Sequence, residues 1–195
     1  MLKSICVYCG SSTGISPIHA EAARALAQQM VRENIALVYG GGKVGLMGVI
    51  ADEVVRLGGE ATGIIPKALL DKEVGHGELT RLFVVKDMHE RKAMMADMSD
   101  GFIALAGGIG TLEELFEVLT WAQLGIHEKP IGLLNSGGFY DGLIGFVQHL
   151  VAQGFLRPQH ADLLKIAPEP GELLNMLRLA SARPSMANPS MQGLI

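Results

Sequence analysis

Short apolar segments alternate with segments of helical periodicity along almost the whole chain. Several of the apolar segments are continuous runs rather than alternating apolar and polar residues. A strand of this kind is buried on both faces, which is typical of a parallel sheet covered by helices on both sides. The sequence therefore predicts an α/β fold, a single doubly wound, Rossmann-like domain with a parallel sheet.

The expected elements follow one another with short connections. Strands are expected at residues 5–8, 36–39, 61–65, 82–85, 102–105, 131–134 and 163–166. Helices are expected at residues 17–33, 45–57, 88–98, 111–124, 140–153 and 171–179. Ser16 is the expected N-cap of the first helix, with Pro17 at its first position. We expect a nucleotide-binding domain over residues 1–180 and a disordered tail over residues 181–195, where periodicity ends and Pro, Ser and Asn increase.

Composition and charge argue against several classes of partner. The net charge is −4 over 195 residues, so the chain lacks the excess of Lys and Arg that nucleic acid or an anionic membrane would attract. No apolar run approaches the roughly 18 residues of a membrane span. The first residues lead into an apolar strand without a signal-peptide pattern, and there are only two cysteines. We therefore expect a cytoplasmic protein with neither a nucleic acid nor a membrane as partner.

Three glycine-bearing turns follow three of the expected strands, at residues 10–14, 40–42 and 107–111. In an open parallel sheet, ligands bind at the carboxyl ends of the strands. A glycine turn that leads into a helix offers backbone N–H groups and the positive end of the helix dipole, and both favour a phosphate. The convergence of these turns predicts a phosphate site.

Other glycine-loop functions fit less well. Residues 40–45, GGGKVG, formally match the dinucleotide-binding fingerprint. That fingerprint also needs an acidic residue at the end of the next strand, whereas Glu60 comes before that strand. The chain also lacks the Gly-x-x-x-x-Gly-Lys-Ser/Thr pattern of P-loop ATPases and kinases. The sequence therefore favours neither NAD binding nor P-loop chemistry.

Cys6 and Cys9 could form a redox pair or half of a metal site. A reactive redox pair lies at a helix start, whereas Cys6 lies inside an expected strand, and a structural zinc site needs about four ligands. The six histidines are scattered without metal-ligand spacing. We interpret the two cysteines as small buried packing residues and expect no metal.

Glu114 lies in the first turn of the helix expected after the third glycine turn. Thr111 and Glu114 have the spacing of a capping box, in which both side chains bond backbone N–H groups at a helix start. Alternatively, Glu114 is a catalytic carboxylate that meets developing positive charge. A helical wheel places it between the apolar and polar faces, where a carboxylate can be half-buried in a crevice.

Arg91 shares a helical stripe with Met88, Met95 and Met98. An arginine on an apolar stripe needs an anionic partner, and either a substrate phosphate or Glu114 could be that partner. A solvated helix face explains the adjacent Lys92. The pattern favours a functional role for Arg91.

These motifs resemble the LOG ("lonely guy") family of cytokinin riboside 5′-monophosphate phosphoribohydrolases. The family signature joins an Arg-Lys helix to Pro-Gly-Gly-x-Gly-Thr-x-x-Glu. The corresponding segments are MHERKAMM at 88–95 and AGGIGTLEE at 106–114, with Ala106 in place of the proline. Further similar segments are CVYCGSS at 6–12, LVYGGGKVGLMG at 37–48, GIIPKAL at 63–69 and TWAQLGIHEKPIGLLN at 120–135.

The resemblance implies hydrolysis of the N-glycosidic bond of a purine nucleoside 5′-monophosphate, either AMP or a cytokinin-type N6-substituted analogue. The products would be the free base and ribose 5-phosphate. It also implies a homodimer that needs no metal or organic cofactor. The family has often carried a lysine decarboxylase label, but the sequence offers no support for a pyridoxal-phosphate Schiff-base site.

The resemblance also assigns residues. The catalytic pair falls on Arg91 and Glu114. The implied substrate contacts are Glu73, Lys92, Gly107, Gly108, Ile109, Gly110, Thr111, Leu112, Glu113 and Thr120, with Ser11, Ser12, Gly40, Gly41 and Gly42 as further candidates.

The chemistry of glycoside cleavage fits this assignment. Cleavage passes through an oxocarbenium-like state, which an ionised Glu114 would stabilise while orienting or deprotonating the attacking water. The helix dipole would help to keep that carboxylate ionised. Arg91 would anchor the substrate or position Glu114. The alternative is a non-catalytic nucleotide- or molybdenum-cofactor-binding carrier, which would have no need of the Arg91 and Glu114 pair.

Overall fold

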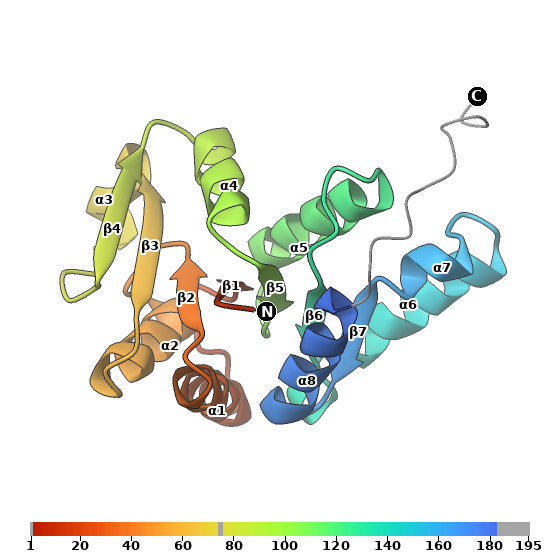
Figure 1. Cartoon of the computed structure of the whole chain (residues 1–195), viewed down its shortest axis with the longest axis horizontal. Coiled ribbons are helices and arrows are strands. Elements are labelled where there is room, and N and C mark those ends of the chain that lie inside the picture. The colour runs from red at the N-terminus through yellow and green to blue at the C-terminus, as the bar shows by residue number, and fades with distance from the viewer. Residues whose placement is uncertain (1, 74–75, 183–195) are drawn as a thin grey trace.

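The computed structural model of the chain describes residues 2–73 and 76–182. Its centre is a seven-stranded parallel sheet with the strand order β4-β3-β2-β1-β5-β6-β7 (Figure 1). The strands are β1 (Ser4–Tyr8), β2 (Ala36–Tyr39), β3 (Ala61–Pro66), β4 (Arg81–Val85), β5 (Gly101–Ala104), β6 (Ile131–Leu134) and β7 (Leu164–Ala167). The strands are parallel because each connection crosses over the sheet through a helix.

Helices cover both faces of this sheet (Figure 1). They are α1 (Ile18–Arg32), α2 (Gly45–Arg56), α3 (Lys67–Glu73), α4 (Met88–Asp97), α5 (Ile109–Gln123), α6 (Asp141–Ala152), α7 (Pro158–Ala161) and α8 (Pro170–Ser181), with a short 3-10 helix at Ser136–Gly138. One apolar core lies between the sheet and α1, α2 and α8. A second core lies between the sheet and α4 and α5. The expectation of a doubly wound, Rossmann-like domain is therefore confirmed.

The sheet has its topological switch point between β1 and β5. The chain passes from β1 to β2 on one side, and β5 pairs with β1 on the other. The N–H of Leu105 donates to the carbonyl of Tyr8 at 2.9 Å, and that of Gly10 donates to Ala106 at 3.0 Å. These bonds continue the pairing beyond the strands. The loops that follow β1 and β5 therefore begin side by side at the place where doubly wound proteins bind ligands.

Several helix boundaries differ from the expected ones. Helix α1 begins at Ile18 with Pro17 as its N-cap residue, so the prediction that Ser16 caps it is wrong. Helices α3 and α7 were not predicted. They span Lys67–Glu73 and Pro158–Ala161, which makes each too short to show an amphipathic period. Helix α8 extends to Ser181, one residue into the expected tail. Residues 183–195 of that tail lie outside the described residues.

Helix α5 begins two residues earlier than the sequence predicts, at Ile109, with Gly108 as its N-cap residue. The first helical bond runs from the N–H of Leu112 to the carbonyl of Gly108 at 3.1 Å. Glycine is unfavourable in the interior of a helix. Gly110 is tolerated in the first turn of α5, where backbone N–H groups have no partner within the helix. Thr111 is therefore the third helical residue rather than the cap. The capping-box interpretation of Thr111 and Glu114 is wrong.

Candidate active site

The loops at the switch point pack against one another through glycines. A Cβ atom on Gly10 would lie 3.3 Å from the Cα of Gly107, and one on Gly107 would overlap the hydroxyl of Thr111. Gly45, at the start of α2, has a φ of +59°, and a Cβ there would overlap the backbone of Ser11 and Ser12. The structure thus brings the loop after β1 into contact with both the loop after β5 and the start of α2.

Two of the three glycine turns are exposed at this edge of the sheet. Gly108, Ile109 and Gly110 are exposed at the N-terminus of α5, and Ser11 and Ser12 are exposed in the loop after β1. The backbone N–H groups of Gly108, Ile109 and Gly110 lie at a helix start, which is a favourable place for an anion. Gly107 and Leu112 are partly buried and Thr111 is buried, so these residues support the loop from below.

The middle turn does not open to solvent, because Gly40, Gly41 and Gly42 are all buried. A Cβ atom on Gly40 would overlap the guanidinium of Arg91. The carbonyl of Gly40 accepts a hydrogen bond from Nη2 of Arg91 at 3.1 Å. This turn therefore provides space and a hydrogen-bond acceptor for Arg91 instead of offering N–H groups to a phosphate from the surface.

Arg91 lies in α4, whose start is fixed by Asp87. The carboxylate of Asp87 accepts a hydrogen bond from the N–H of Glu90 at 2.9 Å. Arg91 is only 6% exposed, and its Nη1 lies 3.7 Å from the sulfur of Met88. Its Nε is buried without a hydrogen-bond partner among the described residues. A buried N–H of a cation with no acceptor is costly, so the guanidinium is suited to bind an anion brought by a ligand.

Glu114 lies in the second turn of α5 and is partly buried. Burial raises the pKa of its carboxyl from 4.5 to about 7, although the positive charge of Arg91 opposes this change. The effect of a helix dipole falls off within the first turn. The earlier start of α5 moves Glu114 away from that turn. The helix dipole therefore contributes little to the ionisation of Glu114, and burial is the main influence on the pKa of its carboxyl.

Glu114 lies close enough to Cys6 and Cys9 for its charge to influence both thiols. Burial raises the pKa values of the Cys6 and Cys9 thiols well above their usual range, and the negative charge of Glu114 raises them further. In the described part of the chain no ion pair joins Glu114 directly to Arg91. Arg91 thus influences Glu114 through its charge and not through a direct ion pair.

Lys92 has a different environment from the solvated one expected. Its side chain is only 12% exposed, and its Nζ lies 2.6 Å from Oε1 of Glu113 and 3.0 Å from Oε1 of Glu117. The ammonium group therefore links α4 to α5. Because Arg91 precedes Lys92 and Glu114 follows Glu113, this link holds the two helices that carry the candidate catalytic pair. In the structure, Lys92 and Glu113 are bonded to each other.

Thr120, another substrate contact implied by the resemblance, lies away from the start of α5. The hydroxyl of Thr120 donates to the carbonyl of Phe116 at 2.7 Å. Thr120 lies six residues after Glu114, about 9 Å further along the axis of α5. Glu73 is the last residue of α3, and its side chain lies outside the described part of the structure.

Sequence reasoning missed residues that hold the crevice together. Gly45 could have been found from its position at a helix start, where a positive φ is common in glycine turns. Tyr140 gave no such signal, yet its buried hydroxyl donates to the carbonyl of Leu105 at 2.6 Å and fixes the entrance to the third glycine turn. Asp52 and His76 also gave no signal, and they interact at 2.7 Å beside Gly41.

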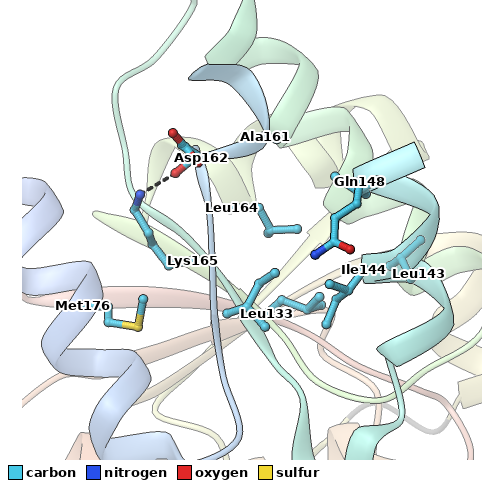
Figure 2. Close-up of a pocket in the computed structure, with 11 residues that line it drawn as sticks. Leu133, Leu143, Ile144, Gln148, Ala161, Asp162, Leu164, Lys165 and Met176 are labelled. Carbon is cyan, nitrogen blue, oxygen red and sulfur yellow. Dashed lines mark hydrogen bonds between the residues drawn. The ribbon is translucent and has the colours of Figure 1, made fainter. Parts of the chain in front are cut away.

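A cavity of about 430 Å³ lies elsewhere, between β6, α6, α7, β7 and α8 (Figure 2). Leu133, Ile144, Leu164 and Met176 give it largely apolar walls, and Gln148 and Lys165 add polar groups. None of its lining residues belongs to the crevice at the switch point. It is therefore separate from the candidate active site.

The described residues offer neither a metal site nor a membrane helix. Within residues 2–73 and 76–182, no group of three or more His, Cys, Asp or Glu side chains could hold a metal ion. No described helix is both long enough and apolar enough to cross a membrane.

The carboxyl edge of the sheet carries a glycine loop at a helix start, a buried arginine whose Nε has no partner among the described residues, and a carboxyl with a raised pKa. Together with the sheet topology, these features make the chain a Rossmann-like α/β protein with a candidate anion site at a helix start. The family model described as "Possible lysine decarboxylase" matches residues 47–177. The cytokinin riboside 5′-monophosphate phosphoribohydrolase LOG5 of Arabidopsis thaliana is 50% identical over 175 residues, which cover 90% of this chain and 77% of that protein. LOG1 of the same organism is 49% identical, with 90% and 82% covered. The chain belongs to the LOG family.

Solved structures extend the likeness in fold. The molybdenum cofactor carrier protein of Chlamydomonas reinhardtii has a TM-score of 0.69 at 19% identity and covers 94% of this chain and 100% of its own. The molybdenum cofactor binding protein of Rippkaea orientalis has a TM-score of 0.66 at 23% identity, with 92% and 97% covered. At these identities the comparison shows a shared fold alone.

Lys92 does not fit the role of a Schiff-base lysine for the pyridoxal phosphate that a lysine decarboxylase would use. A Schiff-base lysine must lose its proton to react. Lys92, the lysine beside the crevice in α4, is instead bonded to two carboxylates that favour its charged form.

Proposed function

We propose that this chain hydrolyses the N-glycosidic bond of purine nucleoside 5′-monophosphates, giving the free base and ribose 5-phosphate. The observation that carries the proposal is the pair formed by Arg91 and Glu114, in a chain about half identical to proteins named for this activity. The substrate class covers AMP and its N6-substituted, cytokinin-type analogues.

The N-terminus of α5 would hold the substrate. The exposed N–H groups of residues 108–110 and the helix dipole favour a 5′-phosphate. The free Nε–H of Arg91 can donate to a further oxygen of the ligand. Fixing the phosphate at one end of the ribose places C1′ relative to Glu114, and such orientation contributes several kcal/mol, on the order of 7, to rate enhancement.

Glu114 would act on the ribose and on the attacking water. As the bond between C1′ and the purine nitrogen breaks, its electron pair goes to the base and positive charge develops on the sugar. The ionised carboxylate stabilises that charge and accepts a proton from the water that attacks C1′. The protonated carboxyl can then return this proton to the leaving purine. A pKa of about 7 suits both steps at neutral pH.

We expect the 5′-phosphate to be required, because the glycine loop at the start of α5 is suited to an anion. The test compares AMP, N6-isopentenyl-AMP and adenosine as substrates and measures the free base by chromatography. Adenosine should have a kcat/KM at least about a hundredfold below that of AMP, since loss of the 5′-phosphate removes both binding and orientation. Equal kcat/KM values for AMP and adenosine would identify a general nucleosidase and contradict the proposal.

The second candidate function is a nucleotide or molybdenum-cofactor carrier without turnover, and the shared fold with such carriers favours it. A carrier gains nothing from a carboxyl with a pKa near 7 in its crevice. Tight binding of AMP without release of free adenine over long incubation would support the carrier function. Release of adenine that depends on Glu114 would exclude it.

We expect Cys6 and Cys9 to be dispensable for chemistry. Both are free and buried, and burial raises their pKa values, so neither forms a thiolate readily. Replacement of both by alanine should leave kcat per folded molecule within about twofold of the parent. The lost packing should cost roughly 1 kcal/mol per thiol in a thermal melt. A well-folded double variant without turnover would instead restore the redox or metal interpretation.

The chain is also proposed to form a homodimer. Strand β4 is an edge strand of the sheet, and it exposes Leu82, Phe83 and Val84 next to the exposed Met88 at the start of α4. Exposed apolar edge strands are usually covered by a partner. Light scattering should therefore give twice the 20.8 kDa mass of one chain. Phe83→Glu should shift the mass to that of a monomer, and a monomeric parent would contradict the proposal.

A cytoplasmic location is proposed from the two free cysteines, because a reducing compartment keeps thiols unpaired. Cell fractionation of the tagged full-length chain tests this location.

A further inference from the structure

His76 is a buried histidine in the segment between α3 and β4. Its side chain is 0% exposed, and Nε2 lies 2.7 Å from Oδ1 of Asp52 in α2. Its Nδ1 accepts a hydrogen bond from the N–H of Glu78 at 3.3 Å. Because Nδ1 is an acceptor, Nε2 carries the proton and donates it to Asp52. Both ring nitrogens are therefore bonded.

The backbone of His76 connects this ring to the crevice. Its N–H donates to the carbonyl of Gly41 at 3.3 Å. Gly41 has a φ of +77° and no side chain to hold its conformation. The preceding carbonyl, that of Gly40, accepts the hydrogen bond from Nη2 of Arg91 at 3.1 Å. A series of contacts thus leads from Asp52 through His76 and the Gly40–Gly41 turn to Arg91.

We propose that His76 is a positioning residue for Arg91. By anchoring its ring to α2 and its N–H to Gly41, it fixes the direction of the Gly40 carbonyl, and this carbonyl orients the guanidinium. The inference rests on the proposed catalytic role of Arg91. Without the ring contacts, the turn is held less firmly and Arg91 can leave the geometry that a ligand needs.

The competing explanation is that His76 only fastens a loop to α2. His127, between α5 and β6, provides a matched control for that explanation. Its Nε2 lies 2.9 Å from the carbonyl of Val118, and its Nδ1 accepts from the N–H of Lys129 at 3.1 Å. This is the same two-sided fastening, on a segment that does not lead to the Gly40–Gly41 turn.

The test measures kcat, KM and thermal stability for His76→Ala, His76→Gln and His127→Ala, with AMP as substrate. His76→Ala should lower kcat by up to about a hundredfold, the scale of a misplaced catalytic group, with a smaller change in KM. His76→Gln keeps an amide that can donate to Asp52 and should recover part of kcat. His127→Ala should lower the melting temperature yet leave kcat within about twofold of the parent.

A double variant separates positioning from general destabilisation. If His76 acts through Arg91, His76→Ala should have no further effect on kcat in an Arg91→Ala background. Multiplicative losses in the double variant, or an equal loss of kcat in His127→Ala, would overturn the proposal.

A second readout does not depend on turnover. The Nε–H resonance of Arg91, assigned by its disappearance in Arg91→Ala, should shift or broaden in folded His76→Ala and stay unchanged in His127→Ala. An unchanged resonance in folded His76→Ala would overturn the positioning role even if the chain cleaved no nucleotide. Failure of the parent to release adenine, with the resonance shifted as expected, would instead count against the proposed function.

Discussion

Replacing Glu114 by glutamine should lower kcat for AMP by about a hundredfold or more, the scale for loss of one electrostatic contact to a transition state. Glutamine keeps the size of the side chain but cannot carry the negative charge or accept the proton of the attacking water. The measurement is release of adenine by the folded variant beside a thermal melt. Glu172→Gln, an exposed carboxylate in the first turn of α8, is the control and should keep the parental rate.

The pH dependence gives an independent check on Glu114. Burial raises its pKa to about 7, so the parental kcat/KM should rise with pH and level off above that value, since kcat/KM reports groups of the free enzyme. The rise of kcat/KM with pH should be absent from the residual activity of Glu114→Gln. A parental profile that is flat between pH 5 and 8 would contradict the role of Glu114 as base.

The free energy of unfolding should also depend on the titration of Glu114, but it should decrease as pH rises, whereas kcat/KM increases. The folded pKa lies above the unfolded value of 4.5, so the folded state binds more protons between these two values. The parent therefore loses stability as pH rises from about 4.5 to about 7. Glu114→Gln removes this loss, and its melting temperature relative to the parent should increase from pH 5 to pH 8. If the melting temperature of Glu114→Gln relative to the parent instead decreased from pH 5 to pH 8, the buried environment of the carboxyl would be contradicted.

Replacing Arg91 by alanine should also abolish most turnover, with a loss of at least about a hundredfold in kcat. The melting temperature should stay near that of the parent, because the substitution removes a buried charge together with one hydrogen bond to Gly40. Arg91→Lys tests whether charge alone suffices. Lysine lacks the planar guanidinium, which in Arg91 bonds Gly40 through Nη2 and offers Nε–H to a ligand. Arg91→Lys should therefore recover little activity.

Two further variants complete the Arg91 experiment. Gly40→Ala introduces a methyl group where the guanidinium lies, and it should lower kcat in the parent but not in the Arg91→Ala background. Arg157→Ala, at an exposed position before α7, is the control and should be neutral. Parental rates in both Arg91→Ala and Glu114→Gln would remove the catalytic assignment and favour the carrier function.

Local sequence was sufficient for the strands. Each expected strand lies within one residue of the observed one at either end, because a continuous apolar run between turn residues is a short-range signal. Burial of a strand depends on its neighbours as well. The apolar sequence of β4 predicts burial, but β4 lies at the sheet edge and most of it is exposed. Only the strand order decides which apolar run receives a neighbour on each side.

The sequence by itself determined which residues carry the candidate chemistry. Arg91 on a methionine stripe, Glu114 after a glycine turn, and the order of strand, glycine and helix are all patterns within a few residues. The tertiary structure alone decided how these residues behave. The partner of Arg91 is Gly40, 51 positions away, and the pKa of Glu114 depends on the burial that the packed elements create. Contacts between distant segments and the removal of water arise only when the chain folds, so neither can be derived from local spacing.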